Sequence, residues 1–366
     1  MNGLLSIPGF TAFVMILFMN ATVDIAHKVT IQNVLLKSFE GDTLMMLSAL
    51  INAMILLPFI LLFSPSGYIS DRFSKTTVVR YAALSAVGLT LLITLSYYQG
   101  WFYVSFALTL LLAVQSAIYS PAKYGLIKAL AGVDNLGVAN AVVQAVTIVA
   151  ILLSSILFSV IFEMYYGAQT TPGAILPDMV LIGWILVGLS MVETLFAFRL
   201  PHLDAATHSG SFKWQSYFNL SYLKSNVSRL RVNENIWLSI IGLSLFWGVG
   251  QVIIAAFPAH YKVMTGDENA IVIQAVLAVS AVGLIMGSMV AGRFSKLHIE
   301  LGIVPVGALG LFGSLGLFAL ASEVYIMGIA SLLFGFFGGL FIVPLNASIQ
   351  YFAPERELGT VLAGNN

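Results

Sequence analysis

The sequence contains no cysteine, which excludes disulfide bonds, thiol nucleophiles and thiolate metal ligands. Charged residues make up only 9% of its 366 residues, against about 25% in an ordinary globular domain, while 59% are hydrophobic. H-E-x-x-H, G-x-S-x-G and P-loop motifs are missing, so neither enzyme activity nor a cofactor or metal is expected. The composition also excludes a nucleic-acid binder and a disordered chain. It predicts a polytopic membrane protein.

Long apolar runs dominate the chain. A membrane-spanning helix needs about 20 mostly apolar residues, and ten runs meet this requirement. They are continuously apolar rather than alternating, which favours an all-α protein over a β-barrel. The spacings Gly283/Gly287 and Gly335/Gly339 predict closely packed helices. The predicted spans are 9–36, 45–66, 78–98, 101–120, 138–165, 179–200, 236–257, 270–291, 302–321 and 324–347.

The positions of the basic residues predict the orientation, although the 16 basic and 16 acidic side chains cancel in sum. Cytoplasmic loops are enriched in Lys and Arg. If the N-terminus is cytoplasmic, 13 of the 16 basic residues fall on the cytoplasmic side, and only Lys37 and Lys262 fall opposite. The 13 are Arg72, Lys75, Arg80, Lys123, Lys128, Arg199, Lys213, Lys224, Arg229, Arg231, Arg293, Lys296 and Arg356.

The longest polar stretch, residues 201–235, is predicted to be a cytoplasmic linker between spans six and seven. Its stretch Thr207–Ser211 is small and polar, and aromatic residues mix with lysine over Phe212–Phe218. Such a mixture is typical of a helix that lies among lipid headgroups. A plain linker with incidental aromatics remains the alternative.

A short motif occurs twice. Arg72-Phe73-Ser74-Lys75 is repeated as Arg293-Phe294-Ser295-Lys296, 221 residues later, and each copy follows the second span of a series. Pro121 and Pro344 lie 223 residues apart, and each is predicted to close a fourth span. The repeated motif and the proline pair have nearly the same separation in the sequence. This predicts two homologous halves, an arrangement found in many secondary transporters.

The predicted halves are residues 1–200 and 236–366, joined by the linker. The first half has six spans, whereas the second has four and the start of a fifth. Leu136-Gly137 precedes the fifth span of the first half, and Leu358-Gly359 stands at the matching place in the second. We therefore expect a twelve-span protein that is truncated before its last two helices.

The stretch Gly67-Tyr68-Ile69-Ser70-Asp71-Arg72-Phe73-Ser74-Lys75 resembles the loop motif between helices 2 and 3 of the major facilitator superfamily. In the second copy, Ser288 replaces the glycine and Gly292 replaces the aspartate. The resemblance implies the major facilitator fold, with two pseudo-repeated halves. It also implies that Asp71 faces the start of helix 11 and closes the cytoplasmic side. That partner helix is expected to be missing from this chain.

A narrower resemblance is carried by Tyr119-Ser120-Pro121-Ala122-Lys123-Tyr124-Gly125. Together with Ala139-Asn140, Phe246-Trp247-Gly248 and Val343–Ala347, this run is similar to the lysophospholipid transporter branch of that superfamily. The resemblance implies that lysophosphatidylethanolamine or lysophosphatidylglycerol moves to the cytoplasmic leaflet of a bacterial inner membrane. It also implies an acyltransferase and acyl-carrier-protein synthetase, fused or separate, as a candidate partner.

Two other functions stay open from the residues alone. A proton-coupled exporter of drugs or amphiphiles would use Asp24 or Glu193 as its proton carrier. A membrane module that only serves a fused lysophospholipid acyltransferase would need no transport activity of its own.

Ionisable residues inside the first span are candidates for the substrate path. Asp24, His27 and Lys28 lie three and four residues apart, on one helix face. A charge at mid-membrane is costly, so it normally faces a cavity and has a partner. His27 could also titrate near neutral pH and relay protons. The alternatives are an Asp24–Lys28 ion pair that joins helices and a hydrogen-bonded structural histidine.

Further candidates lie on other spans. Lys123 could bind a lipid phosphate or only anchor the helix end at the cytoplasmic side. Asn140 and Gln144 form a polar face on the fifth span, and Glu193 is an acidic residue inside the sixth. Asn346 matches Lys123 in the repeat. The residues assigned to gating are Gly67, Asp71, Arg72, Lys75, Arg293 and Lys296.

Overall fold

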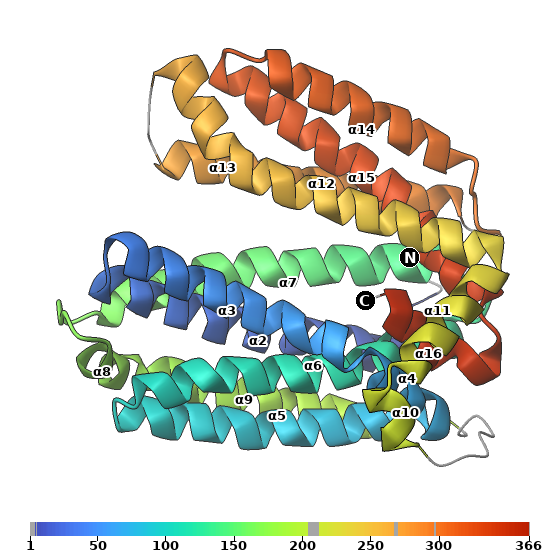
Figure 1. The fold of residues 1–366 in the computed structure, drawn as a ribbon, viewed down its shortest axis with the longest axis horizontal. Coiled ribbons are helices and arrows are strands. Elements are labelled where there is room, and N and C mark those ends of the chain that lie inside the picture. Colours follow the sequence, from blue (N-terminus) through green and yellow to red (C-terminus); the bar gives the residue numbers. More distant parts are fainter. Residues whose placement is uncertain (1–3, 5, 204–211, 267–269, 296–297, 366) are drawn as a thin grey trace. The chain divides into compact units, whose positions relative to one another are not determined.

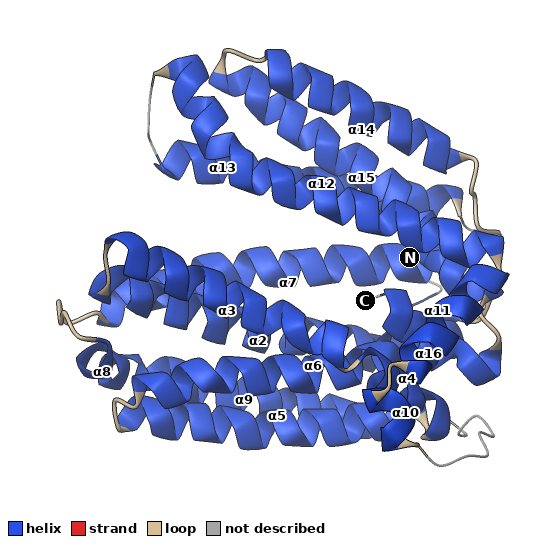
Figure 2. Cartoon of the chain, in the orientation of Figure 1, coloured by secondary structure: helices blue, strands red, loops and turns tan. Residues whose placement is uncertain are grey.

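The computed structural model describes residues 4, 6–203, 212–266, 270–295 and 298–365, and every regular element in these ranges is a helix (Figure 2). Ten of the described helices are long and apolar enough to cross a membrane, which confirms the ten predicted spans. The elements, labelled in Figure 1, are α2 (Phe10–Ser38), α3 (Gly41–Leu61), α4 (Phe63–Arg72), α5 (Lys75–Tyr98), α6 (Phe102–Ala131), α7 (Leu136–Tyr165), α8 (Pro172–Ile175), η1 (Leu176–Met179), α9 (Val180–Phe198), α10 (Trp214–Phe218), α11 (Ser221–Val232), α12 (Glu234–Thr265), α13 (Ala270–Phe294), α14 (Ile303–Leu320), α15 (Val324–Phe352), η2 (Glu355–Glu357) and α16 (Leu358–Asn365).

The prolines do not end helices where the sequence predicted. Pro121 lies inside α6 and Pro344 inside α15, so both helices continue past the predicted ends of spans four and ten. Proline removes one backbone donor, but a membrane helix tolerates this where neighbouring groups satisfy the freed carbonyl. Leu62, by contrast, leaves the helical conformation and separates α3 from α4 inside the predicted span 45–66.

The chain forms two compact units. The large unit comprises residues 5–130, 150–229 and 354–366, and the small unit comprises residues 1–4, 131–149 and 230–353. Helix α7 contributes its first part to the small unit and its second part to the large one. The sequence-based halves, 1–200 and 236–366, stay a prediction.

The large unit is built around α2, α5 and α9. Helix α9 packs against both α2 and α5. Their shared core includes Val23, Ile93, Tyr97 and Leu186, all almost completely buried. The C-terminal helix α16 packs against α4, far from it in sequence (Figure 1).

The small unit is centred on α15, which packs against α12, α13 and α14. A side chain at Gly283 or Gly287 would overlap the α15 backbone at Leu332 or Phe336. The predicted close packing of these glycine-spaced helices is thereby confirmed.

The described part of the linker is mostly helical. Helix α10 and residues 221–229 of α11 belong to the large unit, where Tyr217 Oη donates to the Leu61 carbonyl oxygen over 2.7 Å. Asn226 Nδ2 donates to Ser64 Oγ over 3.2 Å. These two bonds attach the linker to the junction between α3 and α4, while residues Thr207–Ser211 lie outside the described residues.

Candidate functional site

A cluster of polar and ionisable side chains lies between helices of the large unit. It consists of Asp24 on α2, Ser116, Tyr119 and Lys123 on α6, and Glu193 on α9. Ser116 Oγ donates to Asp24 Oδ2 over 2.6 Å. The Lys123 ammonium acts electrostatically on the carboxylates of both Asp24 and Glu193. It also lies 5.2 Å from the centre of the Tyr119 ring, within the range of a cation–π contact.

Several oxygen atoms of this cluster have no hydrogen-bond partner among the residues that the structure describes. They are Asp24 Oδ1, both Glu193 carboxylate oxygens and the Tyr119 hydroxyl, and all are buried. A buried polar group that lacks a partner costs about 1–3 kcal/mol. Four such atoms in one cluster indicate a site that a polar ligand would complete.

The charges of the cluster define what it can bind. One ammonium group faces two carboxyl groups, so the cluster offers both a cationic and an anionic side. Lys123 can attract a phosphate, and Asp24 and Glu193 can accept hydrogen bonds from an ammonium or hydroxyl group. A ligand with a phosphate and a nearby donor group therefore complements the cluster.

The other two candidates on α2 have different surroundings. His27 is completely buried, and its Nδ1 lies 2.9 Å from the Tyr97 hydroxyl. Its Nε2 lies 3.2 Å from the Ser105 carbonyl oxygen and 3.2 Å from Thr109 Oγ1. A neutral imidazole that donates from Nε2 and accepts at Nδ1 satisfies both of the first two contacts. Lys28 is half-buried and forms no ion pair with Asp24.

The polar candidates on α7 and α15 belong to the small unit. Asn140 Nδ2 donates to Gln350 Oε1 over 3.2 Å, and Gln350 Nε2 donates to Asn140 Oδ1 over 2.8 Å. Asn346 Nδ2 donates to the Ile342 carbonyl oxygen of its own helix. Gln144 lies one turn after Asn140 and is half-buried. The Asn140 amide is thus already paired with another helix.

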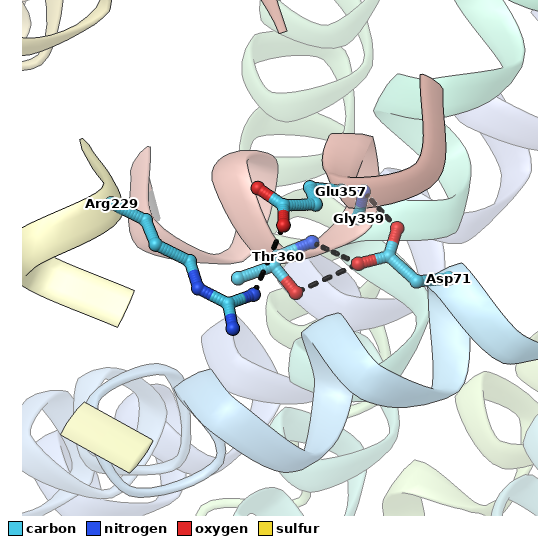
Figure 3. A network of polar contacts seen from close by, with 5 residues as sticks. All are labelled: Asp71, Arg229, Glu357, Gly359 and Thr360. Carbon is cyan, nitrogen blue, oxygen red and sulfur yellow. Dashed lines mark hydrogen bonds and ion pairs between the residues drawn. The ribbon is translucent and has the colours of Figure 1, made fainter. Parts of the chain in front are cut away.

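The gating candidate Asp71 caps the N-terminus of α16 (Figure 3). Asp71 Oδ1 accepts from the Gly359 N–H at 2.5 Å, and Oδ2 accepts from the Thr360 N–H at 2.9 Å and its hydroxyl at 2.7 Å. A carboxylate at this place binds the unpaired N–H groups and the positive end of the helix. Burial raises the pKa of the Asp71 carboxyl above its ordinary value, and the hydrogen bonds from Thr360 and Gly359 oppose that rise.

The expectation that the partner helix of Asp71 is missing from this chain is therefore wrong. Its first turns are α16, which begins at Leu358. Gly67 permits this approach, because a Cβ there would lie only 2.8 Å from the Thr360 Cα. Beside the cap, Arg229 Nη1 lies 3.1 Å from Glu357 Oε1 (Figure 3).

The remaining gating candidates surround or repeat this contact. Lys75 acts electrostatically on Asp71 and Glu355, and the Arg72 guanidinium lies 5.9 Å from the centre of the Tyr68 ring. Arg293 is exposed in the last turn of α13. Lys296 lies outside the described residues.

The small unit contains the equivalent contact of the second repeat. Gly137, at the start of α7, lies against Ser295, and Gly292 lies against Ala141. In the second copy of the motif, Gly292 stands where the first copy has Asp71. The contact there is therefore a close approach of small residues and contains no carboxylate cap. Both repeated loops therefore lie against the start of a helix that begins with a Leu-Gly pair.

Several contributors were not identified from the sequence. Ser116, Tyr119 and Lys123 are spaced by three and four residues, a pattern that places them on one face of α6. That spacing could have identified the first two. Gly359 belongs to the Leu-Gly pair that the sequence marked, but Thr360 and Gln350 carry no comparable local signal, because their partners lie more than 200 residues away.

Comparisons with known proteins show the family of the chain. The family model described as the Major Facilitator Superfamily matches residues 5–366. The chain is 30% identical to the lysophospholipid transporter LplT of Photorhabdus laumondii over 294 residues, which cover 80% of this chain and 68% of that protein. It is 31% identical to the transporter of the same name from Escherichia fergusonii over 309 residues, which cover 83% and 70%.

Solved structures share the fold. The Escherichia coli fucose:proton symporter FucP aligns with a TM-score of 0.76 at 12% identity, covering 98% of this chain and 88% of that one. The human organic anion transporter MFSD10 aligns with a TM-score of 0.70 at 14% identity, covering 97% and 89%.

Proposed function

The chain belongs to the major facilitator superfamily, and from this premise we propose that it is a secondary transporter that moves lysophospholipid across a membrane by alternating access. It is a multi-pass membrane protein. The relatives that carry the name lysophospholipid transporter support the cargo class. The motion would be a rocking of the two repeated halves about a central site.

The observation that carries this proposal is the cluster of Asp24, Tyr119, Lys123 and Glu193, with its buried unpaired oxygen atoms. The phosphate of the headgroup would lie at Lys123. The ammonium of lysophosphatidylethanolamine would donate to Asp24 and Glu193. Lysophosphatidylglycerol would present hydroxyl donors to the same carboxyl oxygens, so both lipids fit the site with different strengths.

The direction and orientation form part of the proposal. The side rich in Lys and Arg would be cytoplasmic, as would the N-terminus. The lipid would then move to the cytoplasmic leaflet of a bacterial inner membrane. The Asp71 cap on α16 would hold the cytoplasmic side closed while the opposite side accepts lipid.

The test is uptake of lysophosphatidylethanolamine and lysophosphatidylglycerol into spheroplasts that carry the intact protein. Charge-assisted hydrogen bonds contribute about 1.5–3 kcal/mol, so Lys123→Gln should weaken the uptake of both lipids roughly tenfold to hundredfold. Asp24→Asn should weaken the ethanolamine lipid more than the glycerol lipid, because only the former brings a positive charge.

The matched control is Asp42→Asn, which removes an exposed carboxylate in the first turn of α3. It should leave both uptake rates unchanged. Full uptake of both lipids by Asp24→Asn would show that this cluster does not bind the headgroup.

A second function is favoured by Glu193, whose completely buried carboxyl group could carry a proton. The protein would then exchange protons for a drug or another amphiphile. This alternative predicts that transport requires an imposed pH gradient and that the Glu193→Gln variant no longer responds to the gradient. Both results together would support it over passive lysolipid movement.

Binding of a phosphate headgroup is also compatible with a membrane module that serves a lysophospholipid acyltransferase. This enzyme, fused or separate, would consume the lipid that the module delivers. Reconstituted protein that flips lysolipid without any acyltransferase would separate transport from a purely supporting role.

A further inference from the structure

A groove of about 730 Å³ lies on the large unit between α4, α5 and α6, apart from the polar cluster. Its wall is almost entirely apolar and includes Phe73, Tyr81, Leu111 and Gly88. Phe73, Tyr81 and Leu111 are exposed. The groove is therefore open along helices that lie in the hydrocarbon region of the bilayer.

The buried polar groups in its wall are already hydrogen-bonded. Gln115 Nε2 donates to the Ala82 carbonyl oxygen over 3.0 Å, and Ser85 Oγ donates to the same oxygen over 2.7 Å. No buried side-chain atom of the lining residues, all of which are described, lacks a partner. A polar ligand would gain no new bond to the buried wall, whereas an apolar ligand would break none.

The length of the groove is close to the hydrocarbon thickness of one bilayer leaflet. Along α5 it extends from Thr77 to Leu89, a distance of about 18 Å at the helical rise of about 1.5 Å per residue. One leaflet contributes about 15 Å, half of the hydrocarbon thickness of about 30 Å. The groove begins near the end of α4, where Ile69 and Phe73 flank the basic residue Arg72.

We propose that this groove is a binding site for one acyl chain of a bilayer phospholipid, with the phosphate at the Arg72 end. The basic end places the headgroup in the headgroup region of the same leaflet. Tyr81, an exposed aromatic residue near that end, suits the membrane interface. The chain then follows α5 and α6 toward the middle of the bilayer.

The bound acyl chain would also pack near the polar cluster, against the turn of α6 that carries Ser116. Gln115 in the groove wall precedes Ser116, whose hydroxyl donates to Asp24. Ser116 Oγ also lies 3.3 Å from Gln115 Oε1. A lipid in the groove thus packs on the turn of α6 that positions Ser116.

Gly88 allows a direct test, because a Cβ added there meets no atom within 4 Å. Gly88→Phe would therefore fill the groove without a clash at the backbone. Gly188 on α9 is equally open but does not line the groove, so Gly188→Phe is the matched control.

The experiment uses the intact protein in nanodiscs of phosphatidylethanolamine that include a small fraction carrying a photoactivatable diazirine on the acyl chain. Mass spectrometry then maps the adducts. Adducts should concentrate on 77–89 of α5 and 111–118 of α6. Gly88→Phe should lower their yield at least about fivefold, because several methylene contacts are lost, while Gly188→Phe leaves it unchanged.

Adducts spread evenly over all lipid-facing helices in the unmodified protein would overturn the proposal, as would an undiminished yield in Gly88→Phe. If Gly88→Phe fails to fold, the distribution of adducts on the unmodified protein still tests the proposal. Crosslinking needs no transport, so its outcome is independent of the proposed cargo.

Discussion

Thr360 donates both its backbone N–H and its hydroxyl to one oxygen of Asp71, 289 residues earlier in the chain. With the bond from Gly359, this contact supplies the first turn of α16 with an acceptor for two of its free N–H groups. It joins α4 to α16 through a charged cap instead of through apolar packing alone.

Replacing Asp71 by Asn should loosen α16. The neutral side chain loses the charge-assisted part of three hydrogen bonds, each worth about 1.5–3 kcal/mol, and the attraction to the helix end. The chain has no native cysteine, so Ala363→Cys, a buried position on α16, provides a single reporter. In the purified protein, where both sides are accessible, its labelling by a maleimide should accelerate about tenfold or more.

The control for that experiment is Asp134→Asn, which changes a carboxylate at an exposed turn and should leave the labelling rate unchanged. An unaltered labelling rate in Asp71→Asn would contradict a gating role for the cap.

Glu193→Gln should stabilise the protein and impair transport. Both carboxyl oxygens of Glu193 are buried without a partner, so the neutral amide of similar shape avoids the cost of a buried charge. If the carboxylate binds the headgroup, uptake falls while the unfolding temperature rises by a few degrees. Thermal unfolding in detergent and lysolipid uptake measure the two effects. The exposed Glu40 offers the control Glu40→Gln, and a variant that is neutral in both assays would remove Glu193 from the site.

The reciprocal amide pair of Asn140 and Gln350 should behave as a coupled unit. Each single alanine variant leaves one buried amide unpaired, so the two losses in stability should not add. A double-mutant cycle on the free energy of unfolding should give a coupling of about 0.5–3 kcal/mol. The same cycle between Gln350 and Ser244, which bonds only within its own helix, should give none. Additive losses for Asn140 and Gln350 would show that the pair contributes no specific stability.

His27 should prove structural and not a proton relay. His27→Ala removes the imidazole acceptor of the buried Tyr97 hydroxyl and should cost about 1–3 kcal/mol of stability. His27→Gln, which keeps a donor and an acceptor, should cost less and leave the pH profile of uptake in place. A shifted profile in His27→Gln would instead favour a relay.

Local properties of the sequence predicted much of this protein. Hydropathy and length are sufficient for the ten spans, because each helix satisfies its own backbone within the bilayer. The repeated Arg-Phe-Ser-Lys motif placed both loops correctly, and mid-membrane charges singled out Asp24 and Glu193. The helix ends at Pro121 and Pro344 were misjudged, since a proline inside a packed membrane helix loses only one backbone bond.

By itself the sequence determined the class of protein, the spans and which residues carry costly charges, since these follow from composition and short spacings. Only the tertiary structure decided which of them meet. It turned His27 toward Tyr97 and Ser105, brought Ser116 to Asp24, and placed Thr360 on Asp71. Such contacts depend on how helices distant in sequence pack, and no local pattern contains that information.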